Sequence, residues 1–103
     1  MRPRWSQQAV EDLLKVGRYI AGDNPAAARR WVERLRQRAR QAAEFPQAGL
    51  MVPEHSRPEL REVIAGNYRI VYLVDGDAIE VMTVFEGHRL LPDGLVPNPP
   101  KEE

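Results

Sequence analysis

Residues 60–85 read LREVIAGNYRIVYLVDGDAIEVMTVF, and this stretch decides the fold. β-Branched and aromatic side chains dominate it, and its apolar pattern has the period of two that is typical of strands. The turn sequences Gly66-Asn67 and Asp75-Gly76-Asp77 interrupt the pattern and favour hairpins. We therefore predict an antiparallel meander with strands at residues 60–65, 68–74 and 78–85. The third strand is nearly continuously apolar towards its end, so two sets stay open for its core face: Ile79, Val81, Thr83 and Phe85, or the alternate positions.

The chain before this meander has a helical period instead. Ser6 is a suitable N-cap, and apolar residues then recur at helical spacing as far as Gly22, which we expect as the C′ residue of a first helix. Asp23-Asn24-Pro25 supplies a capping side chain and a proline for the start of a second helix, which Pro46 ends at about residue 44 or 45. Residues 1–5 are expected as a short edge strand, and residues 46–58 as a loop.

The predicted order of elements is β-α-α-β-β-β. A short link between two amphipathic helices gives an antiparallel helical hairpin. We expect this N-terminal hairpin to pack on one face of a mainly antiparallel sheet, which is an α+β fold, and the other face to be left open. Residues 1–91 form the single predicted domain, and residues 92–103, which hold four of the nine prolines, form a C-terminal tail.

The composition excludes several classes of protein. With 103 residues, 43% of them hydrophobic and 29% charged, the chain has the balance of one small globular domain. Its apolar runs are too short to cross a membrane, and its first 20 residues lack the apolar block of a signal peptide, so we expect a cytoplasmic protein. Cysteine is absent and only two histidines are present, so no metal site is expected. No cofactor-binding motif is found either.

The net charge of zero conceals an uneven distribution. Residues 1–44 contain ten Lys and Arg against five Asp and Glu, whereas residues 45–103 contain five against ten. Thirteen of the fifteen cations are arginine, whose planar guanidinium suits carboxylate and phosphate partners. Two interpretations stay open: the arginines serve an interface, or the two oppositely charged halves attract each other within the fold.

The meander also gathers polar residues that have a possible chemistry. Three arginines could hold a phosphate, with a histidine as acid and a glutamate as base, which is the set needed to cleave RNA by attack of its own 2′-hydroxyl group. The simpler alternative is that Arg–Glu pairs across neighbouring strands stabilise the outer sheet face. The residues concerned are Arg61, Glu62, Arg69, Glu86, His88 and Arg89.

Several short segments together resemble the RelE/ParE toxin superfamily. The segment YIAGDNPAAA at residues 19–28 is similar to the junction between the helices of ParE-type toxins. Residues 60–63 and 66–72 resemble the central motif of the superfamily, and residues 84–89 resemble its last strand, although Gly-His-Arg replaces the commoner His-Gly-Arg-Arg. The resemblance also includes EFP at residues 44–46, Gly49 and VPE at residues 52–54, and it extends over roughly residues 3–91.

This resemblance implies the toxic half of a bacterial toxin–antitoxin pair. It also implies the helical hairpin and antiparallel sheet derived above, and an antitoxin that binds over the groove and sheet of the toxin in a hetero-oligomer. Such antitoxins are usually acidic in the segment that binds the toxin. The arginines that offer complementary charge are Arg29, Arg34, Arg36 and Arg40, and the alternative for these is a solvated helix face.

Two branches of the superfamily imply different activities. ParE-like members bind DNA gyrase without catalytic chemistry, whereas RelE-like members cleave messenger RNA in the ribosome. The acidic strand half of this chain disfavours a nuclease, because phosphate contacts dominate the binding of nucleic acid. The sequence therefore favours a ParE-like gyrase inhibitor that is not an enzyme. The alternatives are an inactive relative that only binds its antitoxin, or a ribonuclease whose catalytic residues are Arg61, Arg69, His88 and Arg89.

Overall fold

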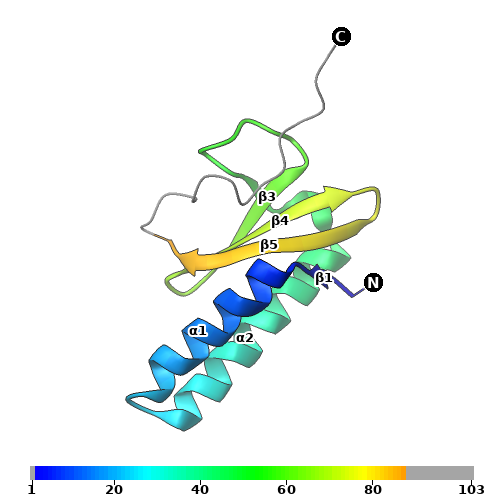
Figure 1. Cartoon of the computed structure of the whole chain (residues 1–103). Helices are drawn as coiled ribbons and strands as arrows, with labels where there is room; N and C mark the ends of the chain where they lie inside the picture. Colours follow the sequence, from blue (N-terminus) through cyan, green and yellow to red (C-terminus); the bar gives the residue numbers. More distant parts are fainter. Residues whose placement is uncertain (1, 88–103) are drawn as a thin grey trace.

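A computed structural model describes residues 2–87 of the chain. The tail expected at residues 92–103 lies outside this range. The described part contains a five-stranded sheet and two helices, and Figure 1 shows both helices on the same side of the sheet. The elements are β1 (Arg4–Trp5), α1 (Gln7–Ala21), α2 (Pro25–Glu44), the 3₁₀ helix η1 (Pro46–Ala48), β2 (Leu50–Met51), β3 (Leu60–Ala65), β4 (Tyr68–Asp75) and β5 (Ala78–Glu86).

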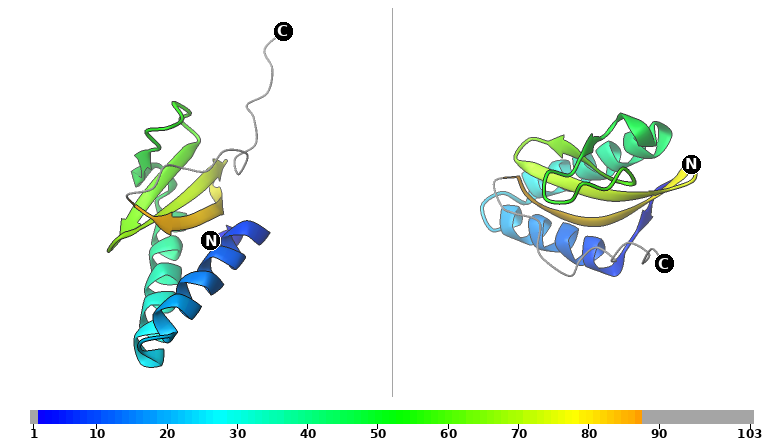
Figure 2. Two further views of the ribbon diagram at one scale, coloured as in Figure 1. Left: turned by 60° about the vertical axis from the view of Figure 1, so that its left-hand side comes forward. Right: turned by 90° about the horizontal axis from the view of Figure 1, so that it is seen from above.

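The sheet has the strand order β1-β5-β4-β3-β2. β1 runs parallel to β5, and the other neighbours are antiparallel. The predicted α+β class, the helical hairpin and the meander are confirmed. Figure 2 shows from two sides that the hairpin crosses one face of the sheet, and in Figure 1 its α1–α2 turn projects beyond the sheet. No helix among residues 2–87 has the length and apolar character of a membrane span.

Side-chain caps begin both helices, as the sequence predicts. The Ser6 hydroxyl accepts a hydrogen bond from the backbone N–H of Ala9 at 3.1 Å, and the Asn24 side chain accepts one from Ala27 at 3.1 Å. The prediction for Gly22 is wrong, because a C′ glycine adopts a left-handed conformation whereas Gly22 has φ −57°. Its backbone N–H instead donates to the carbonyl of Arg18 and so continues the helical hydrogen bonding by one residue.

Most of the hydrophobic core lies between the helices and the sheet. Leu35 and Ala39 of α2 are fully buried there, together with Ile70 and Tyr72 of β4. The Tyr72 hydroxyl donates a hydrogen bond of 2.9 Å to the carbonyl of Pro46, which fixes the chain just after α2. Burial of the ring raises the pKa of Tyr72.

The outer face of the sheet is covered in part, which corrects the expectation of an open face. Val52, from the segment between β2 and β3, is buried there against Leu60 and Val71. Residues 46–58 are also more ordered than a plain loop, because they contain η1 and β2. The two residues of β2 lie between the breakers Gly49 and Pro53, and they become a strand by pairing with Glu62 and Arg61 of β3.

A β-bulge decides the core face of β5. Val71 pairs with Thr83 but Tyr72 pairs with Val81, so Met82 is an extra residue in β5. The extra residue reverses the alternation of side chains. Ile79 and Val81 before the bulge and Val84 after it belong to the helix-side core, whereas Phe85 packs against the outer cluster. Neither of the two regular sets left open by the sequence is therefore correct.

The edge of β5 beyond β1 is closed by the start of α1. The backbone N–H of Ser6 donates to the carbonyl of Val81 at 2.9 Å, and the Ser6 hydroxyl donates to the carbonyl of Met82 at 3.0 Å. The Asp12 carboxylate accepts from the backbone N–H of Val84 at 3.1 Å and from the Thr83 hydroxyl. Side chains of the helix thus supply hydrogen-bond partners that a longer β1 strand would otherwise provide.

The turn between β3 and β4 lies against α2. Gly66 has φ +59°, a conformation that favours glycine, and a Cβ atom at this position would collide with the indole ring of Trp31. Trp31 also meets the Tyr68 ring edge-on, with 5.6 Å between the centroids. Glycine is therefore needed at position 66 both for the backbone conformation and for the close approach of Trp31.

Candidate functional site

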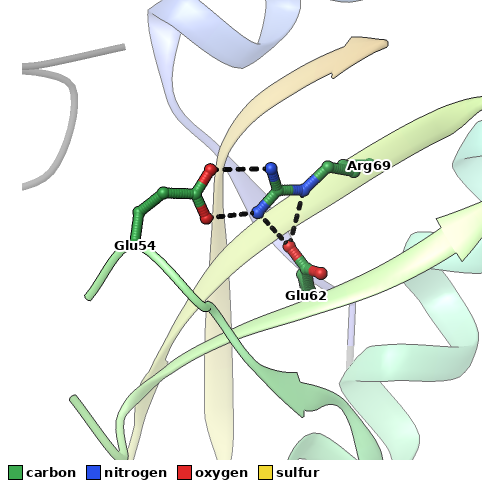
Figure 3. Close-up of polar contacts among 3 residues, drawn as sticks. All are labelled: Glu54, Glu62 and Arg69. Atoms are coloured by element: carbon green, nitrogen blue, oxygen red, sulfur yellow. Dashed lines mark hydrogen bonds and ion pairs between the residues drawn. The ribbon is translucent and has the colours of Figure 1, made fainter. Parts of the chain in front are cut away.

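Arg69 is the centre of a buried charged cluster on the outer face of the sheet. β4 directs its side chain away from the helices, because the next residue, Ile70, lies in the helix-side core. The Arg69 Nε donates to Glu62 at 2.7 Å, and the two terminal nitrogens donate to the two carboxylate oxygens of Glu54, each at 2.8 Å (Figure 3). Arg69 is only 6% exposed. Arg69, Glu54 and Glu62 are called the Arg69 cluster below.

The electrostatics of the Arg69 cluster keep the guanidinium charged. Its hydrogen bonds to Glu54 are the main cause that raises the pKa of Arg69, with a further contribution from Glu62, while burial acts in the opposite direction. The Phe85 ring lies 4.9 Å from the guanidinium carbon, in a cation–π contact. All three guanidinium nitrogens of Arg69 donate to a carboxylate oxygen of Glu54 or Glu62. A guanidinium engaged in this way is less available to a phosphate than an exposed one.

Arg61 lies on the other side of the sheet from Arg69. It alternates in β3 with Glu62 and therefore shares the side of Val63, which belongs to the helix-side core. Its guanidinium donates to the carbonyls of Pro58 at 2.8 Å and Gly49 at 3.0 Å. These bonds fix the chain on both sides of β2, so the position of Arg61 has a structural explanation.

The structure thus brings only part of the predicted polar group together. The pairing of Arg69 with Glu62 is confirmed, Glu54 is an additional partner, and Arg61 is separated from both by the sheet. His88 and Arg89 lie outside the described residues. The catalytic assignment of these arginines and of His88 stays a prediction.

A groove between α1 and α2 is the second candidate region. It encloses about 850 Å³. Val10 and Leu14 of α1, which are 43% and 51% exposed, contribute apolar surface to it. Both residues belong to the apolar pattern that precedes Gly22 in the sequence, but of α1 only Ala9 and Leu13 are buried. The charged residues that line the groove are Arg18, Arg29, Glu33 and Arg36.

The four arginines predicted to bind a partner divide between two sides of α2. Arg29 and Arg36 line the groove. Arg40 continues their side of the helix at the i+4 position from Arg36, and it forms an exposed ion pair with Glu33 at 2.6 Å. Arg34 lies on the other side, over the Trp31 ring at 4.7 Å. Arg18 of α1 also lines the groove, and the spacing of residues within α2 does not predict this.

Among the described residues, no group of three His, Cys, Asp or Glu side chains is placed to hold a metal ion. The Arg69 cluster and the groove differ in their chemistry. The first is charged and closed, and the second is apolar, open and lined by cations.

Comparisons with known proteins agree with this architecture. The family model for the ParE toxin of the type II toxin–antitoxin system parDE matches residues 4–91. Y4kP, a candidate toxin of Sinorhizobium fredii, is 33% identical over 100 residues, which cover 91% of this chain and 96% of the relative. Toxin RelE2 of Caulobacter vibrioides is 31% identical over 87 residues, which cover 84% of this chain and 94% of that toxin.

A solved structure has the same fold. It is described as a chromosomal ParDE toxin–antitoxin system from P. aeruginosa, and it matches with a TM-score of 0.68 over 84% of this chain and 95% of that chain. The sequences are 18% identical, so this likeness concerns the fold alone. Taken with the family model and the relatives, it leads to one assignment: the chain belongs to the ParE toxin family of type II toxin–antitoxin systems.

Proposed function

We propose that this protein inhibits DNA gyrase by binding to it, without a catalytic site of its own, and that a cognate antitoxin neutralises it. The observation that carries the proposal is the engagement of Arg69 by two carboxylates. A nuclease needs uncompensated positive charge where the scissile phosphate lies, because phosphate contacts dominate affinity for nucleic acid. Arg69, on the outer face, instead donates through all three guanidinium nitrogens to the carboxylates of Glu54 and Glu62.

The position of Arg61 supports the same proposal. Its hydrogen bonds to Gly49 and Pro58 hold backbone segments, and its side chain lies on the other side of the sheet from Arg69. The two arginines would have to lie on one face to contact a single phosphate. A toxin that acts by binding needs no such arrangement.

The helical groove is the expected binding site of the antitoxin. Val10 and Leu14 give it an apolar floor, while Arg18, Arg29 and Arg36 give it a positive rim. An amphipathic segment with acidic residues beside its apolar face matches both properties. Arg40 extends the positive side of α2 beyond the groove, whereas Arg34 faces away from it. We expect a toxin–antitoxin hetero-oligomer, formed in the cytoplasm.

The second candidate function is a ribosome-dependent ribonuclease that uses Arg61, Arg69, His88 and Arg89. The observation that favours it is the relative from Caulobacter vibrioides, which is 31% identical and carries the name RelE2. A relative without toxicity, which only binds its antitoxin, is the third. These three functions differ in the process that stops when the toxin is produced.

The decisive experiment is induction of the chain alone in a bacterial host, with pulse labelling of DNA, RNA and protein synthesis. We expect DNA synthesis to stop first, and the purified protein to inhibit supercoiling by purified gyrase and to trap cleaved plasmid. Early arrest of protein synthesis, with messenger RNA cleaved in a purified ribosome assay, would establish the ribonuclease instead. Continued growth at full soluble expression would favour the relative without toxicity.

Antitoxin binding is tested with two double variants of α2. Arg29→Glu/Arg36→Glu reverses the charge along the groove, and Arg30→Glu/Arg38→Glu makes the same change on the opposite side of the helix. We expect the groove variant to weaken the complex with the antitoxin at least tenfold in a titration, and the control variant to keep the affinity within about twofold. Equal losses in the two variants would contradict binding in the groove.

A further inference from the structure

The side of α2 that faces away from the groove carries a second set of arginines. Arg30, Arg34 and Arg38 are spaced by four residues, so they form one row along the helix with a rise of about 6 Å between neighbours. We call them the outer arginine row. Arg30 and Arg34 are exposed and Arg38 is half-buried. The row therefore presents three positive charges along one side of α2.

No carboxylate neutralises this row within residues 2–87. Glu33, the one acidic residue of α2 before its last position, pairs with Arg40 on the groove side. Arg38 makes only long hydrogen bonds, of 3.4 Å each, to the carbonyl of Ile64 and to the side chain of Gln41. This differs from the Arg69 cluster, where each donor of the guanidinium faces a carboxylate.

Arg34 is held in place without losing its charge. Its guanidinium carbon lies 4.7 Å from the centroid of the Trp31 ring. A cation–π contact restricts the side chain but leaves the guanidinium positive and able to donate hydrogen bonds. Trp31 itself is fixed against Tyr68 and Gly66, so the contact positions Arg34 on a rigid support.

The chemistry around the row fits a polyanion better than a protein partner. Protein interfaces need an apolar centre, which the groove has. The outer row is flanked by the exposed side chains of Gln37 and Gln41, and by the exposed Ile64, whose carbonyl accepts from Arg38. We propose that the outer arginine row binds the phosphate backbone of duplex DNA without reading its sequence. This proposal goes beyond gyrase inhibition and does not depend on it, because binding is measured with DNA and the toxin alone.

Duplex DNA is favoured over RNA by the shape of the element. The major groove of B-form DNA admits an α-helix, whereas the major groove of A-form RNA is too narrow for side chains to enter. Binding of single-stranded RNA uses aromatic rings on which bases stack. The aromatic ring beside the row, that of Trp31, is already covered by Arg34 on its face and meets Tyr68 at an edge.

The test is fluorescence anisotropy of a labelled 20-base-pair DNA duplex between 50 and 200 mM salt. The wild type is compared with Arg30→Gln/Arg34→Gln/Arg38→Gln and with a control that loses three charges elsewhere, Arg2→Gln/Arg4→Gln/Lys15→Gln. Each phosphate contact contributes about 0.9 to the slope of log K against log salt. We expect the outer-row variant to have a slope shallower by up to about 2.7, with affinity at 50 mM salt reduced on the order of tenfold or more. The control should stay within about twofold of the wild type.

Three outcomes would overturn the proposal. The first is no binding of the wild type to the duplex at 50 mM salt, and the second is an equal loss in the control variant, which would show a general effect of net charge. The third is tighter binding of a single-stranded RNA, a duplex RNA or poly-glutamate than of DNA. The single variants Arg30→Gln and Arg38→Gln, each expected to reduce the slope by about 0.9, keep the test valid if the triple variant unfolds.

Discussion

The two faces of the sheet are stabilised by different means. On the helix side, α1 and α2 bury a large apolar cluster that includes Leu35, Ile70 and Tyr72. On the outer side, a small cluster around Val71 lies beside the Arg69 cluster, whose carboxylates come from β3 and from the segment before it. The face without a helix is therefore closed in part by charge pairing. Buried charges are stable only when each has its partner, so this face is more sensitive than apolar packing is to the loss of a single group.

The largest effect is expected from removing the guanidinium of the Arg69 cluster. Arg69→Met keeps much of the volume but removes the guanidinium that pairs with the buried Glu62 and the half-buried Glu54, so we expect a loss of about 3–5 kcal/mol in the free energy of unfolding, measured in urea. The triple variant Glu54→Leu/Glu62→Leu/Arg69→Met removes all three charges and should recover most of this loss. A single variant within about 1 kcal/mol of the wild type would show that the cluster contributes little.

The next-largest loss of stability is expected from a substitution on the helix side of the sheet. Leu35→Ala removes a fully buried side chain at the centre of the larger cluster, and we expect a cost of about 3 kcal/mol from lost transfer energy and a residual cavity. Val71→Ala, at the smaller outer cluster, deletes fewer carbon atoms and should cost less. Chemical unfolding of both variants measures the difference. An equal or larger cost for Val71→Ala would show that the outer cluster is as tightly packed as the helix side.

The two glycine turns of the meander allow a smaller, matched test. Gly66 and Gly76 both have positive φ, but a Cβ atom at Gly76 meets no atom within 4 Å, whereas at Gly66 it collides with Trp31. We expect Gly76→Ala to cost about 1–2 kcal/mol from the backbone alone. Gly66→Ala should cost about 1–3 kcal/mol more from overpacking against the helix side. Thermal unfolding of the pair separates the two contributions, and equal costs would show that Trp31 moves aside freely.

The smallest expected effect is a loss of folding stability at alkaline pH. Burial raises the pKa of Tyr72 above its usual value of 10.0, so the unfolded chain loses this proton first as the pH rises. The stabilising contribution of the neutral phenol is thus fully present below pH 10 and is lost as the pH rises through the folded-state pKa.

Tyr72→Phe tests this dependence. It removes the hydrogen bond to Pro46 and should cost about 1 kcal/mol at pH 7. It should also make the decline of stability above pH 10 less steep, although Tyr68, whose pKa burial also raises, keeps part of that decline. Urea unfolding at pH 7 and pH 11 measures both effects. If stability declined equally steeply in Tyr72→Phe and the wild type, groups other than Tyr72 would be the cause of the decline.

The elements that the sequence predicted well depend on local signals. The strands of the meander and the caps Ser6 and Asn24 follow from turn residues and hydrogen bonds within a few positions. The bulge at Met82 and the short strand β2 depend on pairing with distant residues, so no local pattern contains them.

The candidate sites also depend on contacts between residues that are distant in the sequence. Glu54 reaches Arg69 across 15 positions from an irregular segment, and its role follows only from the folded chain. The separation of Arg34 from Arg29 and Arg36 was predictable from helical spacing. Arg29 and Arg36 are seven residues apart and share a side of the helix, whereas Arg34 is five residues from Arg29 and two from Arg36 and therefore lies on another side. The exposure of Leu14 could not be predicted from the sequence, because it depends on how the two helices pack against each other.

The pairing of β1 with β5 has a consequence for the synthesis of the toxin. Ser6 and Asp12 find their hydrogen-bond partners only at Val81, Met82, Thr83 and Val84, more than 70 positions later in the chain. The first residues to leave the ribosome therefore cannot complete their native contacts until the last strand has followed. A chain interrupted before β5 lacks the strand that packs against α1, so it should never acquire the toxin fold. Completion of synthesis and completion of folding are in this way linked by the order of the strands.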